Sequence, residues 1–439
     1  MTDPLAQPLR LPCGAVLPNR LCKAAMTEGL ADPQLHATAR HERIYRLWSE
    51  GGSGLLLTGN VQIDRFCLER PGNVAIDGKG GLQQLRAWAA AGTVAGNHLW
   101  MQLAHAGRQS PRYVTGRPVA PSAVQLEVLG NYARPRALTE DEILDFVRRF
   151  AAAARTAREA GFTGVQLHSA HGYLMSSFLA PVTNRRTDAW GGSIENRTRF
   201  LIETLRATRR AVGADFPLSV KLNSDDFRKG GFSHEDCLRV IELLNPEGID
   251  LLEISGGTYE QPRLLGVDGA AATAAPARDS TRQREAYFID YAEKIRQVAR
   301  MPLMVTGGFR TRAAMAEALA GACDVIGLAR PLVSDPAAAR KLLAGEIDAL
   351  PAQERALNAH GDGWLSRRGF MHYVHAYAGI SWYYIQIFRL ADGLPVDFDL
   401  TPGRALRLFA WDEQKTAWRM RKARAPRERV VAGEAGTLA

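Results

Sequence analysis

Two histidines and a tyrosine stand close together, directly behind a short apolar segment. His168, His171 and Tyr173 follow Gly164–Leu167, where small and apolar residues alternate as in a buried strand. Imidazole and phenol groups exchange protons and donate hydrogen bonds during catalysis. This density of reactive side chains behind one strand indicates an active site, although a histidine pair alone is more often structural.

The residues from 168 to 200 form a long and specific motif. They resemble the signature of the old yellow enzyme family, the NADH:flavin oxidoreductase/NADH oxidase family of flavin-dependent ene-reductases. The matching residues are His168, His171, Tyr173, Phe178, Leu179, Pro181, Asn184, Arg186, Asp188, Trp190, Gly191, Gly192, Ser193, Glu195, Asn196, Arg197, Arg199 and Phe200. The resemblance covers roughly residues 10–340 and implies an FMN-dependent enzyme with a barrel fold.

Short β-like runs alternate with helical stretches along most of the chain. The strands are expected at Leu21–Met26, Gly54–Val61, Leu99–Ala104, Gly164–Leu167, Leu218–Leu222, Leu251–Ile254, Leu303–Thr306 and Val325–Leu328. Eight strands in β-then-α alternation predict an α/β fold, a (β/α)8 TIM barrel of parallel strands. In such a barrel the carboxyl ends of the strands carry the catalytic groups.

Helix start signals support the same alternation. Thr139 and Glu142 fit a capping box for a helix to about residue 160, and Ser233 opens a helix to about residue 244. Thr311 precedes a further helix. The alanine-rich residues 270–277 are expected to form a loop before a helix at residues 287–298.

The βα alternation stops near residue 345, which divides the chain into a barrel at 1–345 and a C-terminal extension at 346–439. The extension is rich in aromatic residues and then basic, with nine Lys/Arg against three Asp/Glu between residues 403 and 430. Such a run can bind nucleic acid or an acidic membrane. We favour instead a helix that packs one face and solvates the other, because Leu406, Phe409, Trp411 and Trp418 interleave with the charges.

Composition agrees with a soluble enzyme that we expect in the cytoplasm. The five cysteines are scattered, without a C-x-x-C pair, which argues against a disulfide framework or a thiolate metal cluster. The apolar runs are too short to span a membrane, and the start MTDPLAQPLR lacks a signal-peptide core. We expect a small-molecule substrate and no nucleic-acid or membrane partner. A homo-oligomer is compatible with the sequence.

Two glycine-containing segments point to a phosphate site. Neither a G-x-G-x-x-G nor a P-loop motif is present, but Gly307 and Gly308 end the seventh strand, and Ala329 and Arg330 end the eighth. The glycines are equally explained as strand-to-helix turns. The resemblance implies that these residues cradle the FMN phosphate, although the family usually has glycine where this chain has Ala329.

Further flavin contacts are implied by the resemblance at the earlier strand ends. They are Ala25, Met26, Thr27, Gly59, Gln102 and Lys221, with Lys221 placed beside N1 of the ring. Each polar residue also has a plain structural interpretation. Thr27 can cap a helix, Gln102 can be a core polar group, and Lys221 can be an ion-pair partner.

The resemblance implies a two-step reaction in one pocket, in which NADH or NADPH reduces FMN and an α,β-unsaturated carbonyl compound reoxidises it. His168 and His171 would bind the carbonyl oxygen and Tyr173 would donate the proton. Residues 255–259 would shape the substrate pocket. Three alternatives stay open: a metal site, which lacks an obvious third ligand; a flavin-free aldolase or isomerase using Lys221; and a non-catalytic barrel that binds an acidic partner.

Overall fold

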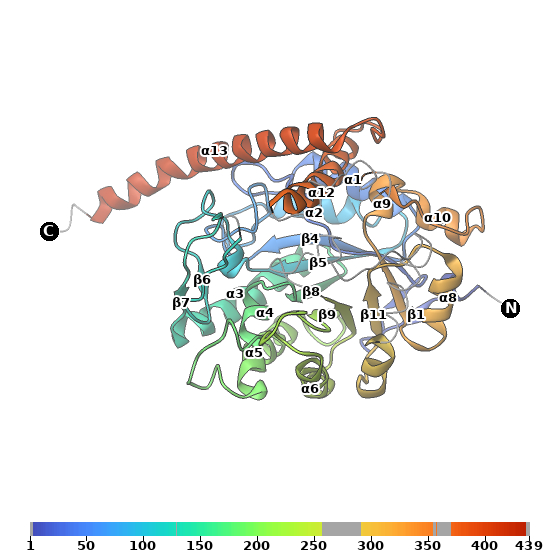
Figure 1. Cartoon of the computed structure of the whole chain (residues 1–439), viewed down its shortest axis with the longest axis horizontal. Coiled ribbons are helices and arrows are strands. Elements are labelled where there is room, and N and C mark those ends of the chain that lie inside the picture. The colour runs from blue at the N-terminus through green and yellow to red at the C-terminus, as the bar shows by residue number, and fades with distance from the viewer. Residues whose placement is uncertain (1–2, 129, 257–290, 354–356, 358–369, 436–439) are drawn as a thin grey trace.

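Eight parallel strands form a closed barrel in the computed structural model, which describes residues 3–128, 130–256, 291–353, 357 and 370–435 (Figure 1). In order around the barrel they are β3 (Leu21–Lys23), β4 (Leu55–Gln62), β5 (His98–Ala104), β8 (Gly164–Ser169), β9 (Leu218–Asn223), β10 (Leu251–Ser255), β11 (Leu303–Thr306) and β12 (Val325–Leu328). The predicted (β/α)8 barrel is confirmed, and each of its strands overlaps a predicted one, although β3 ends at Lys23 and not at Met26 as predicted.

Apolar side chains close the amino-terminal end of the barrel. Cys22, Leu55, Trp100 and Met304 project into its interior and pack together with a small hairpin beneath them. That hairpin pairs β1 (Leu9–Arg10) with β2 (Val16–Leu17). Because this end is filled, polar groups and ligands are accommodated at the other end, where the strands finish.

Helices surround the barrel and pack their apolar faces on the outside of the strands. The longer ones are α1 (Ala39–Glu50), α2 (Leu82–Ala91), α3 (Glu140–Glu159), α5 (Ile194–Val212), α6 (His234–Leu244) and α8 (Arg312–Gly321). The predicted helix starts are confirmed: Thr139 and Glu142 form a capping box on α3, and the side chains of Ser233 and Thr311 accept hydrogen bonds from the first turns of α6 and α8.

Short elements complete the barrel. They are η1 (Pro4–Ala6), η2 (Gly107–Gln109), β6 (Val119–Ala120), β7 (Arg136–Ala137), α4 (Leu174–Leu179), η3 (Asn245–Glu247), α9 (Pro331–Ser334) and α10 (Ala338–Leu343). The predicted loop at 270–277 lies outside the described residues, as do residues 287–290 of the predicted helix, whose remainder at 291–298 is helical.

In the described part of the C-terminal extension lie the helices α12 (Phe370–Ala391) and α13 (Pro402–Ala435). They pack against each other and cover one side of the barrel, α12 lying next to α1 (Figure 1). Trp382 and Phe409 belong to the same hydrophobic core as the barrel helices. Within the described residues, no helix is long and apolar enough to cross a membrane.

The packed face of α13 differs from the predicted one. Phe409 and Met420 are buried against the barrel, 6% and 1% exposed, but Trp411 and Trp418 point outward and are 70% and 61% exposed. The prediction that the tryptophans belong to the packed face was therefore wrong. Helical geometry explains the error, because Trp411 lies about 200° around the helix from Phe409, on its opposite side.

Candidate active site

His168, His171 and Tyr173 come together at the carboxyl end of β8. The ring of His168 lies 5.3 Å from that of His171 and 4.7 Å from that of Tyr173, between ring centroids, and both contacts are close to edge-on. His168 is 4% exposed and Tyr173 is also 4% exposed. The structure thus brings the three predicted catalytic side chains into one cluster.

The conformation of His171 is fixed by its neighbours. Its backbone is in the left-handed region with φ of 62°, which is rare for a residue other than glycine. Asn223 Oδ1 accepts a hydrogen bond from the His171 amide at 3.2 Å, and Ser255 Oγ lies 2.8 Å from Nε2 of the ring. Strained backbone held by flanking polar groups is common at functional sites.

Both imidazoles are held in the neutral form. Burial lowers the pKa of His168 well below its usual value, and the charges of His171 and Lys221 lower it further. Burial also lowers the pKa of His171, with Lys221 as the second cause. Since Nδ1 of His168 accepts the amide hydrogen of Ala170 at 3.3 Å, the ring proton of His168 is assigned to Nε2.

A chain of hydrogen bonds connects Tyr173 to Thr27, in the segment that follows β3. Asn60 donates through Nδ2 to the Tyr173 hydroxyl at 3.3 Å, and Asn60 Oδ1 accepts from Thr27 Oγ1 at 3.0 Å. Asn73 donates to the same Oδ1 at 3.1 Å. Thr27 thus binds Asn60 through its hydroxyl and does not cap a helix, which was its structural interpretation from the sequence. Sequence reasoning did not identify Asn60.

A second chain crosses the floor of the site. Lys221 Nζ lies 2.8 Å from Glu253 Oε1, and both side chains are almost fully buried. Gln166 donates to the other oxygen of Glu253 at 2.9 Å, and Gln102 donates to Gln166 at 2.7 Å. Lys221 is therefore an ion-pair partner and Gln102 is a core polar group, as their structural interpretations predicted. The same two side chains also offer a cation and a carboxamide to a ligand in the site.

Gly59 lies within β4 and packs tightly against the segment that follows β3. A Cβ atom at this position would lie 2.2 Å from Glu28 Oε2 and 2.5 Å from the Met26 carbonyl oxygen. The Gly59 amide donates to Glu28 Oε1 at 2.8 Å. The Met26 backbone carbonyl cannot move away as a side chain can, so packing alone is sufficient to require glycine here. Ala25, Met26 and Thr27 are half-buried at this same edge.

The ends of β11 and β12 have the properties of an anion site. Gly307 and Gly308 have φ of 139° and 78°, conformations that glycine adopts readily. The Arg330 guanidinium is half-buried and makes no hydrogen bond or ion pair with the side chains that the structure describes, and the buried Thr306 hydroxyl has no partner there either. Ala329 has no positive φ, so the alanine carries no conformational cost.

These groups fit FMN. Arg330, the Thr306 hydroxyl and the glycine amides suit a phosphate, and the Lys221 cation and the Gln102 carboxamide suit the polar edge of the ring. Among the described residues, no three His, Cys, Asp or Glu side chains are grouped so that they could hold a metal ion. Gly257, Thr258 and Tyr259 of the predicted substrate loop lie outside the described residues.

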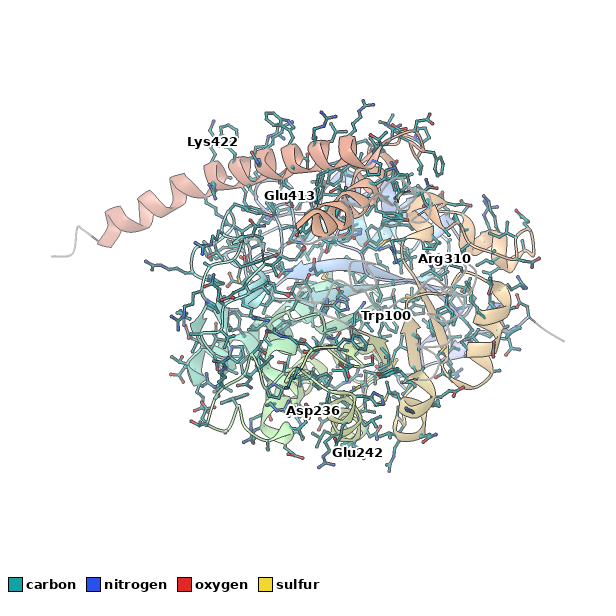
Figure 2. The ribbon with its side chains drawn as sticks, viewed as in Figure 1. Trp100, Asp236, Glu242, Arg310, Glu413 and Lys422 are labelled. Carbon is teal, nitrogen blue, oxygen red and sulfur yellow. The ribbon has the colours of Figure 1, made fainter. Side chains whose placement is uncertain are left out.

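The second half of the sequence motif is structural. The Asn184 side chain donates to the carbonyls of Phe178 and Trp190, both at 2.8 Å. Arg197 forms an ion pair with Asp236 at 3.0 Å, behind α4, and Asp236 is labelled in Figure 2. These contacts hold the segment after Tyr173 against α5 and α6, and so support the cluster without entering it.

Comparison with known proteins agrees with this geometry. The model of the NADH:flavin oxidoreductase / NADH oxidase family matches residues 4–348, which excludes α12 and α13. NADH-dependent flavin oxidoreductase iccE of Talaromyces variabilis is 38% identical over 354 residues, covering 76% of this chain and 84% of that protein. The iliE protein of Neonectria sp. (strain DH2) is also 38% identical, over 75% of this chain but only 46% of its own length.

Solved structures share the barrel. The old yellow enzyme homologue from Zymomonas mobilis aligns with a TM-score of 0.66 and 27% identity, over 80% of this chain and 95% of that one. A 2-naphthoyl-CoA reductase aligns with a TM-score of 0.72 and 27% identity, over 79% of this chain and 53% of that one. The chain therefore belongs to the NADH:flavin oxidoreductase / NADH oxidase family and is a flavin oxidoreductase with FMN as its cofactor.

Proposed function

We propose that the protein reduces the C=C bond of an α,β-unsaturated carbonyl compound, or of a related activated alkene, with hydride from NADH or NADPH in a ping-pong cycle. The observation that carries the proposal is the cluster of two neutral, buried imidazoles beside the Tyr173 phenol at the open end of the barrel. Bound FMN supplies the hydride chemistry that connects the two substrates. The side chains of this chain do the rest.

His168 and His171 would bind the carbonyl oxygen of the substrate. Reduction at the β-carbon moves negative charge onto that oxygen, and N–H donors that are already in place stabilise it. The proton on Nε2 of His168 is available for this contact, because its Nδ1 is engaged by Ala170. Since both rings are neutral, they polarise the carbonyl without the desolvation cost of a buried imidazolium.

Tyr173 would deliver the proton to the α-carbon. Its hydroxyl oxygen accepts a hydrogen bond from Asn60, and such a donor stabilises the phenolate that remains after the proton has left. Its ring packs against His168, so the proton donor and the carbonyl-binding groups lie side by side. This proximity fixes the α-carbon relative to the oxygen.

Lys221 would provide the cation beside the flavin. Its ion pair with Glu253 is buried, and Glu253 is in turn bound by Gln166, so the ammonium group is held in one position. This arrangement disfavours the aldolase alternative, because a Schiff base requires a free amine and Lys221 is committed to a carboxylate.

Product analysis with labelled cofactor tests the proposal. The protein is supplied with NADH or NADPH deuterated at the transferred position and with a cyclic enone in ordinary water. We expect one deuterium at the β-carbon of the saturated ketone and a solvent hydrogen at the α-carbon. Loss of label would mean only that the flavin N–H exchanges with water before the second half-reaction, whereas an allylic alcohol in place of the saturated ketone would contradict the assignment.

A further inference from the structure

The outer face of α13 carries a straight stripe of aromatic, aliphatic and basic side chains. The stripe consists of Arg404, Leu408, Trp411, Lys415, Trp418 and Lys422, all exposed and separated by four, three, four, three and four positions. This spacing places them on one side of the helix, along roughly 27 Å of its length. Lys422 lies 5.3 Å from the centre of the Trp418 ring.

Acidic side chains are absent from this stripe. Asp412 is half-buried and lies about 100° around the helix from Trp411. Glu413 points to the barrel, where its carboxylate lies 3.1 Å from Arg70 Nε and accepts a hydrogen bond from Tyr113 at 3.0 Å. Figure 2 shows the contrast, with Lys422 on the outside of α13 and Glu413 on the side that faces the barrel.

We propose, against the expectation from the sequence that no membrane is a partner, that the outer face of α13 docks the protein on an anionic lipid bilayer surface. Indole rings partition to the interface of a bilayer, and Lys and Arg bury their aliphatic stems while their charges reach the headgroups. The two exposed tryptophans and three cations of the stripe match this environment. The helix would lie parallel to the surface, as peripheral amphipathic helices do, and would not cross the membrane.

The shape of the surface favours a bilayer over a nucleic acid. Single-stranded nucleic acids bind in grooves, where aromatic side chains and basic walls surround the bases. The stripe instead lies on the convex outside of one helix, at the edge of the molecule (Figure 1). A convex stripe with two large apolar rings matches a flat, fluid surface.

A second copy of this chain is a poor partner for the outer face of α13. In a two-fold pairing, the stripe would meet its own copy, so that Arg404, Lys415 and Lys422 would face cations with no carboxylate in the stripe to neutralise them. Unpaired like charges across an interface oppose association. An anionic lipid surface, in contrast, would neutralise the positive charges of the stripe.

Sedimentation with vesicles tests the proposal on the 439-residue chain carrying FMN. Vesicles of phosphatidylcholine containing phosphatidylserine are compared with vesicles of phosphatidylcholine alone, at low and at physiological salt. We expect the protein to sediment with the anionic vesicles, and binding to weaken as salt increases. Equal sedimentation with both vesicles, or none with either, would overturn the proposal.

Two variants separate the contributions of charge and of the aromatic rings. Lys415→Glu combined with Lys422→Glu should weaken binding at least tenfold, since each cation near an anionic surface contributes roughly fivefold. The matched control is Arg148→Glu combined with Arg155→Glu, the same change of charge on the exposed side of α3, which should bind nearly as wild type.

Trp411→Ser combined with Trp418→Ser should also weaken binding roughly tenfold, with Leu144→Ser on α3 as its control. If the tryptophan pair is dispensable while the charge pair is essential, the stripe is a general polyanion site and the lipid proposal fails. If the protein binds single-stranded DNA as tightly as it binds anionic vesicles, the lipid proposal fails as well. The visible flavin band of each variant verifies that the barrel is intact.

Discussion

The protonation of the two histidines is the residue-scale property on which the proposed chemistry depends. Burial and the nearby Lys221 keep the pKa values of His168 and His171 well below normal, so the rings are neutral in the native site at physiological pH. A neutral imidazole donates one hydrogen bond without placing a net charge beside the flavin. The two histidines therefore act as fixed dipoles.

Replacing His168 with alanine should slow enone reduction by about 10² to 10³-fold, the usual loss for one oxyanion donor. Reduction of the enzyme by NADH or NADPH should slow much less, because hydride leaves the nicotinamide without building negative charge on a carbonyl oxygen. Stopped-flow measurement of the two half-reactions distinguishes these effects. Full enone activity in the variant would remove His168 from the mechanism, and loss of the flavin band would show that its role is structural.

Tyr173→Phe removes the proposed proton donor and keeps the ring that packs on His168. Transfer of a proton by a positioned side chain typically contributes about 10² to 10⁴-fold, so the oxidative half-reaction should slow by that order. The reductive half-reaction is the internal control. An unchanged rate of enone reduction would mean that solvent supplies the proton.

At the scale of elements, the barrel strands could be predicted because each is a short, almost entirely buried and mostly apolar run before a turn. The polar network at their ends could not be predicted as completely. Asn60 enters the site because the register of β4 against β5 shifts between Leu57 and Asn60, and an irregular strand breaks the alternation on which the prediction depends.

Glu253, unlike Asn60, could have been identified from its position in the sequence. A carboxylate in the middle of the apolar strand LLEIS is costly to bury unless it is paired. The partner, Lys221, occupies the neighbouring position on β9. The family resemblance identified the lysine, but the pairing depends on strand register, which spacing within one strand does not reveal.

One buried arginine lies at the centre of the contact between α13 and the barrel. Arg70 is 3% exposed, pairs with Glu413, and lies 4.0 Å from the Tyr384 ring of α12 and 4.6 Å from the Phe409 ring of α13. Glu413→Ala would leave this guanidinium buried without its carboxylate, which should destabilise the fold by about 3 kcal/mol.

Urea unfolding measures that loss, with Glu159→Ala as the control. Glu159 pairs with Arg86 at 3.4 Å, but both side chains are more than half exposed, so the control should lose less than about 1 kcal/mol. Equal effects of the two substitutions would show that Arg70 does not anchor the extension.

The stability of the whole molecule should fall on the acid side of neutrality. Burial, followed by the charge of Arg40, lowers the pKa of His41 to about 3, and His168 and His171 are shifted in the same direction. The unfolded chain takes up these protons near pH 6.5, whereas the native state does not. Stability is therefore complete above that pH and decreases below it, by up to about 1.4 kcal/mol per pH unit for each histidine.

Two further buried groups change how the stability depends on pH. Burial raises the pKa of Asp226 to about 6, so its protonation in the native state offsets part of the acid loss. Burial opposes the charged form of His105, but Cys67 and Asp64 raise its pKa to about 9, and its contribution is lost as the pH rises through that value. Urea midpoints across this range should peak near neutral pH, and His41→Gln should flatten the acid side. An unchanged acid slope in that variant would contradict the assignment to His41.

The central claim is tested most directly by an anaerobic titration of the purified protein, followed by visible absorbance. Addition of NADH or NADPH should bleach the flavin band, and subsequent addition of a simple cyclic enone should restore it with formation of the saturated ketone. A band that bleaches but does not recover with any activated alkene would leave a flavin reductase without ene-reductase activity. A colourless protein that takes up no added FMN would contradict the account as a whole.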